Sequence, residues 1–289
     1  MTCVIPLSRC NTGRFPATCV SIDHYENFPV ASVLLPARLR KPVELIYRFA
    51  RTADDFADEG DLPDRERLDL LAGFGDELRR IESGAQPHTA LFQELASMIA
   101  QQRLTISLFH DLLSAFAQDV TKKRYADLAD VLDYCRRSAN PVGRLLLELY
   151  GAATPRNNAW SDNICSALQI INFLQDIAID YANGRIYMPQ DELARYHISE
   201  TQIAAQEAND AWRAFMAFEV GRTRRMLLDG APLGRLLGGR LGLEMRMIIA
   251  GGERILAKIE NAGYDVFRRR PVLRSGDWIL MFARTFSLR

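Results

Sequence analysis

The sequence has few of the residues on which most metal and nucleotide sites depend. It holds only four histidines and five cysteines. No Glu-x-x-His, His-Glu-x-x-His or Cys-x-x-Cys occurs, which argues against a di-iron carboxylate bundle and against zinc. A Gly-x-x-x-x-Gly-Lys loop and a Gly-x-Gly-x-x-Gly turn are also missing, so nucleotide binding has no motif. The 36 basic and 36 acidic residues balance, and this neutral charge gives no sign of a nucleic-acid partner.

Long apolar segments are missing as well. The N-terminal sequence contains no apolar core of the length that a signal peptide needs, and no stretch approaches the length that spans a bilayer. An odd number of cysteines without paired spacing fits a reducing compartment better than a disulfide framework. We therefore expect a cytoplasmic protein whose segment 1–20 is loosely ordered.

Apolar residues at spacings of three and four fill most of the chain. This periodicity predicts helices over 43–58, 64–82, 89–118, 126–150, 158–182, 200–228 and 235–262. Pro42 stands where a first helical turn would begin, and no useful length alternates with period two. Hydrophobic residues make up 48% of the chain, and no repeat or composition shift marks a boundary. Residues 1–289 are thus predicted to form a single all-α domain of roughly eight or more helices.

The first of two acidic pairs lies in "IYRFARTADDFADEGD". Asp54 and Asp58 are four residues apart, so they share one helix face, and Tyr47 and Arg51 continue that face. A carboxylate pair beside an arginine is suited to a phosphate group that is held through a cation and also contacted directly.

The second pair, Asp176 and Asp180, supplies the only charges within residues 164–181. Gln169 and Asn172 continue its polar stripe along an otherwise apolar helix. Like charges at this spacing destabilise a helix slightly, and burying them without partners costs much more. Mg²⁺ prefers oxygen ligands and typically binds through one or two carboxylates together with substrate phosphates. Two helices that present aspartates to a shared cavity could therefore hold a diphosphate through bridging magnesium.

Structural explanations remain open for both pairs. The 54–59 cluster could be a solvated acidic helix end. A lysine or arginine elsewhere in the chain could neutralise the 176/180 pair.

Both acidic segments resemble known motifs. "IYRFARTADDFAD" and "QIINFLQDIAIDYANGRIYMP" resemble the two aspartate-rich motifs of the squalene and phytoene synthase family, and "RYADLADVLDYCRRSANPVG" at 124–143 resembles the segment between them. "HYENFPVASVLLPARLR" at 24–40 is similar to the branch that makes hydroxysqualene in the bacterial hopanoid route. The similarity extends from about residue 24 to about residue 270, in the family's motif order.

This resemblance implies an isoprenoid synthase fold, a helical domain around a central active-site cavity. It implies that Asp54, Asp58, Asp176 and Asp180 bind Mg²⁺ and take part in catalysis. Pro141 breaks a helix and is expected to free carbonyls near Arg137 and Ser138. Tyr134, about one turn before those carbonyls, is a further catalytic candidate. The residues expected to bind substrate are His24, Tyr25, Asn27, Tyr47, Arg51, Gln169, Asn172 and Gln175.

The implied reaction is the Mg²⁺-dependent conversion of presqualene diphosphate and water to hydroxysqualene and diphosphate, a carbon–oxygen lyase step. Many relatives carry an arginine where this chain has Gln175 and a glutamate where it has Leu147, and the lower charge favours one diphosphate over two. The alternatives are a prenyltransferase that condenses farnesyl diphosphate, or a phytoene-type enzyme, and a non-catalytic isoprenoid-binding protein. A water-insoluble product favours transient contact with the inner face of the membrane, and the pathway implies coupling to other squalene-pathway enzymes.

Overall fold

The computed structural model describes residues 35–268 and 270–287. The predicted N-terminal segment 1–20 and the candidates His24, Tyr25 and Asn27 lie outside the described residues. The elements, in chain order, are α1 (Ala37–Asp58), α2 (Asp64–Glu82), α3 (Ala90–Gln102), α4 (Ser107–Thr121), β1 (Arg124–Tyr125), α5 (Leu128–Ser138), α6 (Asn140–Leu149), α7 (Pro155–Ala182), β2 (Ile186–Pro189), α8 (Gln190–Arg195), α9 (Glu200–Ala204), α10 (Asp210–Asp229), α11 (Pro232–Leu236), α12 (Gly239–Asn261) and α13 (Ser275–Ser287). The all-α class is confirmed.

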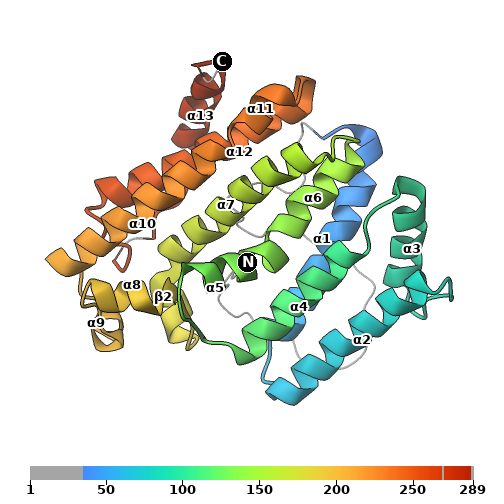
Figure 1. Ribbon diagram of the computed structural model, residues 1–289, viewed down its shortest axis with the longest axis horizontal. Coiled ribbons are helices and arrows are strands. Elements are labelled where there is room, and N and C mark those ends of the chain that lie inside the picture. The colour runs from blue at the N-terminus through green and yellow to red at the C-terminus, as the bar shows by residue number, and fades with distance from the viewer. Residues whose placement is uncertain (1–34, 269, 288–289) are drawn as a thin grey trace.

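The long helix α7 runs through the middle of the molecule (Figure 1). On one side it packs against α10 and α12, and on the other against α5 and α6. Beyond these, α4 packs against α1 and α2, which brings α1 into the same half of the molecule as α6. Within the described part of the chain, no helix is long and apolar enough to cross a membrane.

Side-chain caps explain where several helices begin. The hydroxyl of Thr154 accepts a hydrogen bond from the Asn157 N–H at 3.1 Å, and Pro155 occupies the first turn of α7, where its missing N–H costs nothing. Asp127 caps α5 in the same way at 2.9 Å. At the other end of α7, Gly184 adopts a φ of +76°, a left-handed conformation that glycine takes without strain.

Two apolar clusters hold the helices together. The first cluster is formed by helices α1, α2, α3, α4 and α6. Phenylalanines lie at its centre, where the ring centroids of Phe49 and Phe109 are 5.2 Å apart. The second surrounds α7, α10 and α12, with Trp212 fully buried. Gly143 lets α6 approach α7 closely, because a Cβ there would lie 2.4 Å from the Ser161 Oγ and 2.6 Å from the Cys165 Sγ.

The structure corrects several predicted boundaries. The helix predicted over 89–118 is two helices, separated at Arg103, which has a φ of 55°. The helix predicted over 200–228 is likewise interrupted after Ala204 and resumes at Asp210. Pro42 lies inside α1, which begins five residues earlier at Ala37. The break predicted near Pro141 is confirmed, since α5 ends at Ser138 and α6 begins at Asn140.

A short parallel strand pair is among the elements that the periodicity missed, together with the short helices α8 and α11. In this pair Arg124 faces Ile186 and Tyr125 faces Pro189, with an irregularity in register between them. The Ile186 N–H donates to the Lys123 carbonyl at 3.0 Å. Strand β1 follows α4 and strand β2 follows α7, so their pairing holds the ends of these two helices together. Arg185 directly precedes β2 and is thereby brought to the acidic helices.

Candidate active site

The first acidic motif lies at the C-terminal end of α1. Arg51 binds three carboxylates there, with N···O distances of 3.3 Å to Asp54, 2.6 Å to Asp55 and 2.6 Å to Glu59. Asp54 is buried, whereas the Asp58 side chain keeps 24% of its surface exposed. The cluster is therefore more than a solvated helix end, because one of its carboxylates is inside the protein.

The second motif lies near the C-terminal end of α7 and is more deeply buried. Asp176 is 5% exposed and Asp180 is 2% exposed. Gln169 is also buried and Asn172 is half-buried on the same helix. The Oδ1 atom of Asp180 has no hydrogen-bond partner among the described residues. A buried carboxylate oxygen without a partner is energetically unfavourable unless a cation or a donor binds it.

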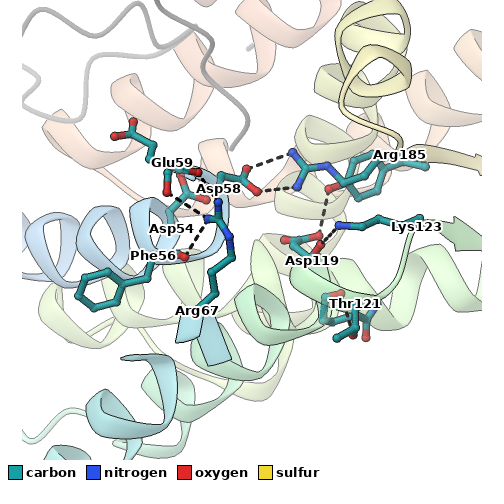
Figure 2. Close-up of polar contacts among 12 residues, drawn as sticks. Asp54, Phe56, Asp58, Glu59, Arg67, Asp119, Thr121, Lys123 and Arg185 are labelled. Carbon is teal, nitrogen blue, oxygen red and sulfur yellow. Dashed lines mark hydrogen bonds and ion pairs between the residues drawn. The ribbon is translucent and has the colours of Figure 1, made fainter. Parts of the chain in front are cut away.

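Arg185 connects the two motifs. Its guanidinium donates to both oxygens of Asp58, at 2.6 and 3.1 Å, although the two residues are 127 positions apart. Figure 2 shows Arg185 and Asp58 pointing toward each other, with Asp119 and Lys123 beside them. Gly184 ends α7 and directs the chain into β2, which fixes the place of Arg185. The two aspartate-bearing helices therefore face one site.

Asp119, on α4, is a further buried carboxylate at this site. Its oxygens accept hydrogen bonds from the Tyr134 hydroxyl at 2.6 Å and the Tyr187 hydroxyl at 3.0 Å. The ring of Tyr187 stacks on Phe173 with centroids 3.9 Å apart. Tyr134 packs against both of these rings, at 5.6 Å from Tyr187 and 6.0 Å from Phe173. Asp119 thus fixes an aromatic wall in which the predicted catalytic residue Tyr134 stands.

The C-terminal part of the chain contributes Arg270 to the second motif. Its guanidinium binds Asp176 through two contacts, one of them Nη2 to Oδ2 at 3.1 Å. Gln175, next to Asp176, is buried and donates from its side-chain amide to the Pro271 carbonyl at 2.5 Å. Neutralisation of the second motif by an arginine, which the sequence left open, therefore occurs for Asp176.

Burial perturbs the carboxylates that lack a bidentate arginine. It raises the pKa of Asp180 from 3.8 to about 8, and the neighbouring charge of Asp176 adds to this effect. It also raises the pKa of Asp54 from 3.8 to about 7, with Asp58 contributing in the same direction. Burial raises the pKa of Asp119 as well, although the hydrogen bond from Tyr134 opposes it. Such perturbed groups gathered in one place are characteristic of functional sites.

The residues present fit magnesium. The donors are carboxylate oxygens, which Mg²⁺ prefers, and one of them lies buried without a hydrogen-bond partner from residues 35–268 or 270–287. Among residues 35–268 and 270–287, no three histidine, cysteine or acidic side chains gather closely enough to form a complete protein metal site. A magnesium ion held here would therefore take its remaining ligands from phosphate oxygens and water.

Sequence reasoning located four aspartates but missed the residues that join them. Asp119 has no acidic residue three or four positions away on its helix, and Arg270 lies in a C-terminal segment without a recognised motif. Arg185 lies inside the second quoted motif, in "YANGRIYMP", and the turn glycine before it was the available signal. Tyr47 lies near enough to Arg51 to interact electrostatically with it. The substrate-binding roles of Tyr47, Gln169, Asn172 and Gln175 stay predictions.

The fold and the paired acidic helices define an all-α isoprenoid synthase. Comparison with known proteins makes the assignment more specific: the squalene/phytoene synthase family model matches residues 23–277, and the chain belongs to that family. It is 39% identical to the hydroxysqualene synthase of Rhodopseudomonas palustris over 241 residues, which cover 81% of this chain and 80% of the relative. It is 28% identical to the 15-cis-phytoene synthase of Synechococcus elongatus, with 87% and 85% covered.

Solved structures agree with this assignment. The crystal structure of squalene synthase HpnC from Alicyclobacillus acidocaldarius matches with a TM-score of 0.77 at 38% identity, over 83% of this chain and 90% of that one. A dehydrosqualene synthase in complex with a ligand matches with a TM-score of 0.79 over 90% of each chain. At 20% identity, this second likeness shows the fold alone.

Proposed function

We propose that the protein converts presqualene diphosphate and water to hydroxysqualene and diphosphate, with magnesium as the cofactor. The similarity to hydroxysqualene synthases over four-fifths of the chain supports this reaction. The structural observation that carries the proposal is the ion pair of Asp58 on α1 with Arg185, just after α7. A buried Asp180 oxygen nearby has no hydrogen-bond partner within the described parts of the chain.

Asp54, Asp58, Asp176 and Asp180 would hold the magnesium ions. Magnesium bound to the diphosphate would act as a Lewis acid that stabilises the leaving group. Arg51 stands on the same face of α1 and can donate to phosphate oxygens.

Arginines supply positive charge where the leaving group gains negative charge. The carbon–oxygen bond breaks with its electron pair on the diphosphate, so donors that are already oriented stabilise the products of ionisation. Arg185 and Arg270 are held in place by Asp58 and Asp176. In an arrangement that binds magnesium through those aspartates, both guanidinium groups would lie next to the diphosphate oxygens.

The aromatic wall of Tyr134, Phe173 and Tyr187 is suited to the carbocation that remains. Ring faces attract cations, most strongly where water is excluded, and these three side chains are 2–3% exposed. Capture by water forms the new carbon–oxygen bond and releases one proton. Because Asp119 accepts from both tyrosine hydroxyls, it fixes the orientation of the two tyrosine rings in this wall.

Condensation of two farnesyl diphosphates is the alternative reaction, and the similarity to a phytoene synthase supports its consideration. One assay separates the two. The purified protein is incubated with Mg²⁺ and either presqualene diphosphate or farnesyl diphosphate, without NADPH, and the products are identified by mass spectrometry. We expect hydroxysqualene from presqualene diphosphate and no turnover of farnesyl diphosphate. Turnover of farnesyl diphosphate alone would overturn the proposal.

A further inference from the structure

The segment that connects α12 to α13 crosses the second acidic motif. We call residues 270–277 the C-terminal strap. Two side chains hold its backbone: the Gln175 amide donates to the Pro271 carbonyl at 2.5 Å, and the Lys258 ammonium donates to the Val272 carbonyl at 2.8 Å. The strap is therefore attached to α7 on one side and to α12 on the other.

Asp277 fixes the far end of the strap. This carboxylate is 4% exposed and accepts from the Arg254 guanidinium at 2.6 Å, from the Lys258 ammonium at 2.5 Å and from the Arg274 backbone N–H at 2.6 Å. These partners outweigh its burial and lower the pKa of Asp277 to about 2. The strap thus has a charged anchor that persists across the physiological pH range, and its amide anchor at Gln175 lies directly beside the active site.

Arg270, the first residue of the strap, is the counter-ion of Asp176. The two residues are 94 positions apart, so nothing local in the chain holds them together. The residue after Arg270 is Pro271, whose carbonyl is the one that Gln175 binds. Gln175 and Asp176 are adjacent on α7, and Arg270 and Pro271 are adjacent on the strap. Two consecutive residues of the helix therefore bind two consecutive residues of the strap.

We infer that Gln175 is a positioning residue that keeps Arg270 on Asp176 and thereby sets how readily magnesium binds there. This inference rests on the proposed function, in which Asp176 is a magnesium ligand. A guanidinium on Asp176 competes with a free metal ion for the carboxylate and repels it. When magnesium binds together with a diphosphate, displacing the guanidinium from Asp176 costs less free energy, because the guanidinium can donate to phosphate oxygens instead. The strap therefore favours joint entry of metal and diphosphate over entry of metal alone.

The anchoring is tested without any ligand. Gln175→Met keeps the length of the side chain and removes its donor, and Thr223→Val is the matched control. The Thr223 hydroxyl is also fully buried and also donates to a backbone carbonyl, that of Glu219 at 2.8 Å, on a helix away from the strap. Hydrogen exchange of peptides covering 268–277 is expected to be about fivefold faster in Gln175→Met, as for the loss of one hydrogen bond, and unchanged in Thr223→Val.

The link to the active site is tested by a double-mutant cycle with magnesium alone as the probe. The half-saturating magnesium concentration is measured by calorimetry in the native protein, Gln175→Met, Arg270→Gln and the double variant. We expect Gln175→Met to lower this concentration about threefold to fivefold in the native background. In the Arg270→Gln background the same substitution should change it less than 1.5-fold, since a residue that acts only through Arg270 has no effect once Arg270 is gone.

The possible failures are distinguishable. Equal effects of Gln175→Met in both backgrounds would show that Gln175 acts on the metal site directly, and the positioning role would be wrong. Unchanged hydrogen exchange in Gln175→Met, with magnesium binding intact, would refute the anchoring alone. Absence of binding of magnesium together with inorganic diphosphate in every variant would instead refute the metal role of Asp176, and with it both the proposed function and the competition inferred here.

Discussion

Asp180→Asn tests the reasoning about the acidic site most directly, because two opposite effects are expected from one substitution. The carboxylate is 2% exposed, its Oδ1 atom has no partner among the described residues, and burial raises its pKa from 3.8 to about 8. Asparagine has nearly the same shape and carries no charge. Without magnesium the variant should therefore be more stable than the native protein, and with magnesium and diphosphate it should gain less stability from the ligand.

The sign and size of the first effect follow from proton linkage. A carboxyl group with a raised folded-state pKa binds more protons in the native state, so its contribution to stability is lost as pH rises from about 4 to about 8. A shift from 3.8 to about 8 corresponds to about 6 kcal/mol in a rigid site. Relaxation of the site and entry of water reduce this cost to about 2–3 kcal/mol. The stability advantage of Asp180→Asn should be near zero at pH 4, grow with pH and level off above pH 8.

Chemical denaturation at pH 5 and pH 8 measures this advantage, and thermal denaturation should show a rise of about 5 °C at pH 8. Asp162→Asn is the control on the same helix, because Asp162 binds Arg144 with two contacts at 3.0 and 2.6 Å at the half-buried surface. That variant should lose about 1 kcal/mol or less and keep the full response to magnesium with inorganic diphosphate. An Asp180→Asn protein that is less stable than the native one at pH 8, or that responds fully to magnesium and diphosphate, would refute the reasoning.

Three further substitutions and one pH series extend the test. Asp58→Asn should lower the free energy of unfolding without metal by about 3 kcal/mol, because the Arg185 side chain, only 6% exposed, loses its bidentate partner. Urea denaturation measures this change, and an unchanged stability would contradict the argument from burial. Asp119→Asn should reduce turnover about tenfold or more while the protein stays folded, since an amide accepts from only one of the two tyrosine hydroxyls in the same way; steady-state kinetics with circular dichroism decides this. Gly143→Ala should cost about 1–3 kcal/mol in urea denaturation, because its Cβ would lie 2.4 Å from a side-chain oxygen on α7. The stabilisation by magnesium with diphosphate should grow from pH 6 to pH 8, because carboxyl groups with a raised pKa must lose their protons before they bind metal. A stabilisation that falls with rising pH would exclude these carboxyl groups as ligands.

Local patterns in the sequence were sufficient for most of the fold. The helix predicted over 64–82 coincides with α2, and the predicted end of the second acidic helix at 182 coincides with that of α7. The interruption at Arg103 was not predictable from periodicity, since apolar residues continue across it without glycine or proline. The strands were missed because each is too short to show an alternating pattern, and β2 is buried on both faces.

The candidate site could be predicted only where its residues are neighbours along a helix. The i, i+4 spacing identified Asp54 with Asp58 and Asp176 with Asp180, because that spacing places side chains on one face whatever the rest of the chain does. Arg185 and Arg270 reach these aspartates over 127 and 94 residues. Such pairings depend on how the helices pack, and no local pattern encodes them. The contact between the Gln175 amide and the Pro271 carbonyl of the strap was likewise not predictable from a local pattern, and the substrate-binding role of Gln175 stays a prediction.

The arginines also answer whether the protein itself neutralises its buried acids. Asp58 and Asp176 each have a bidentate arginine, and Arg51 is shared among Asp54 and two other carboxylates of α1. Asp180 has no such partner among the described residues, and Asp119 has tyrosine hydroxyls instead. Internal neutralisation of the site is therefore incomplete, and it is incomplete at Asp180, the least exposed of the site's carboxylates. A site that served only structure would gain stability from a neutral residue at position 180, so the buried carboxylate of Asp180 supports the proposal that a cation binds there. Under the proposed function, Arg185 and Arg270 neutralise Asp58 and Asp176 until magnesium and the diphosphate bind together.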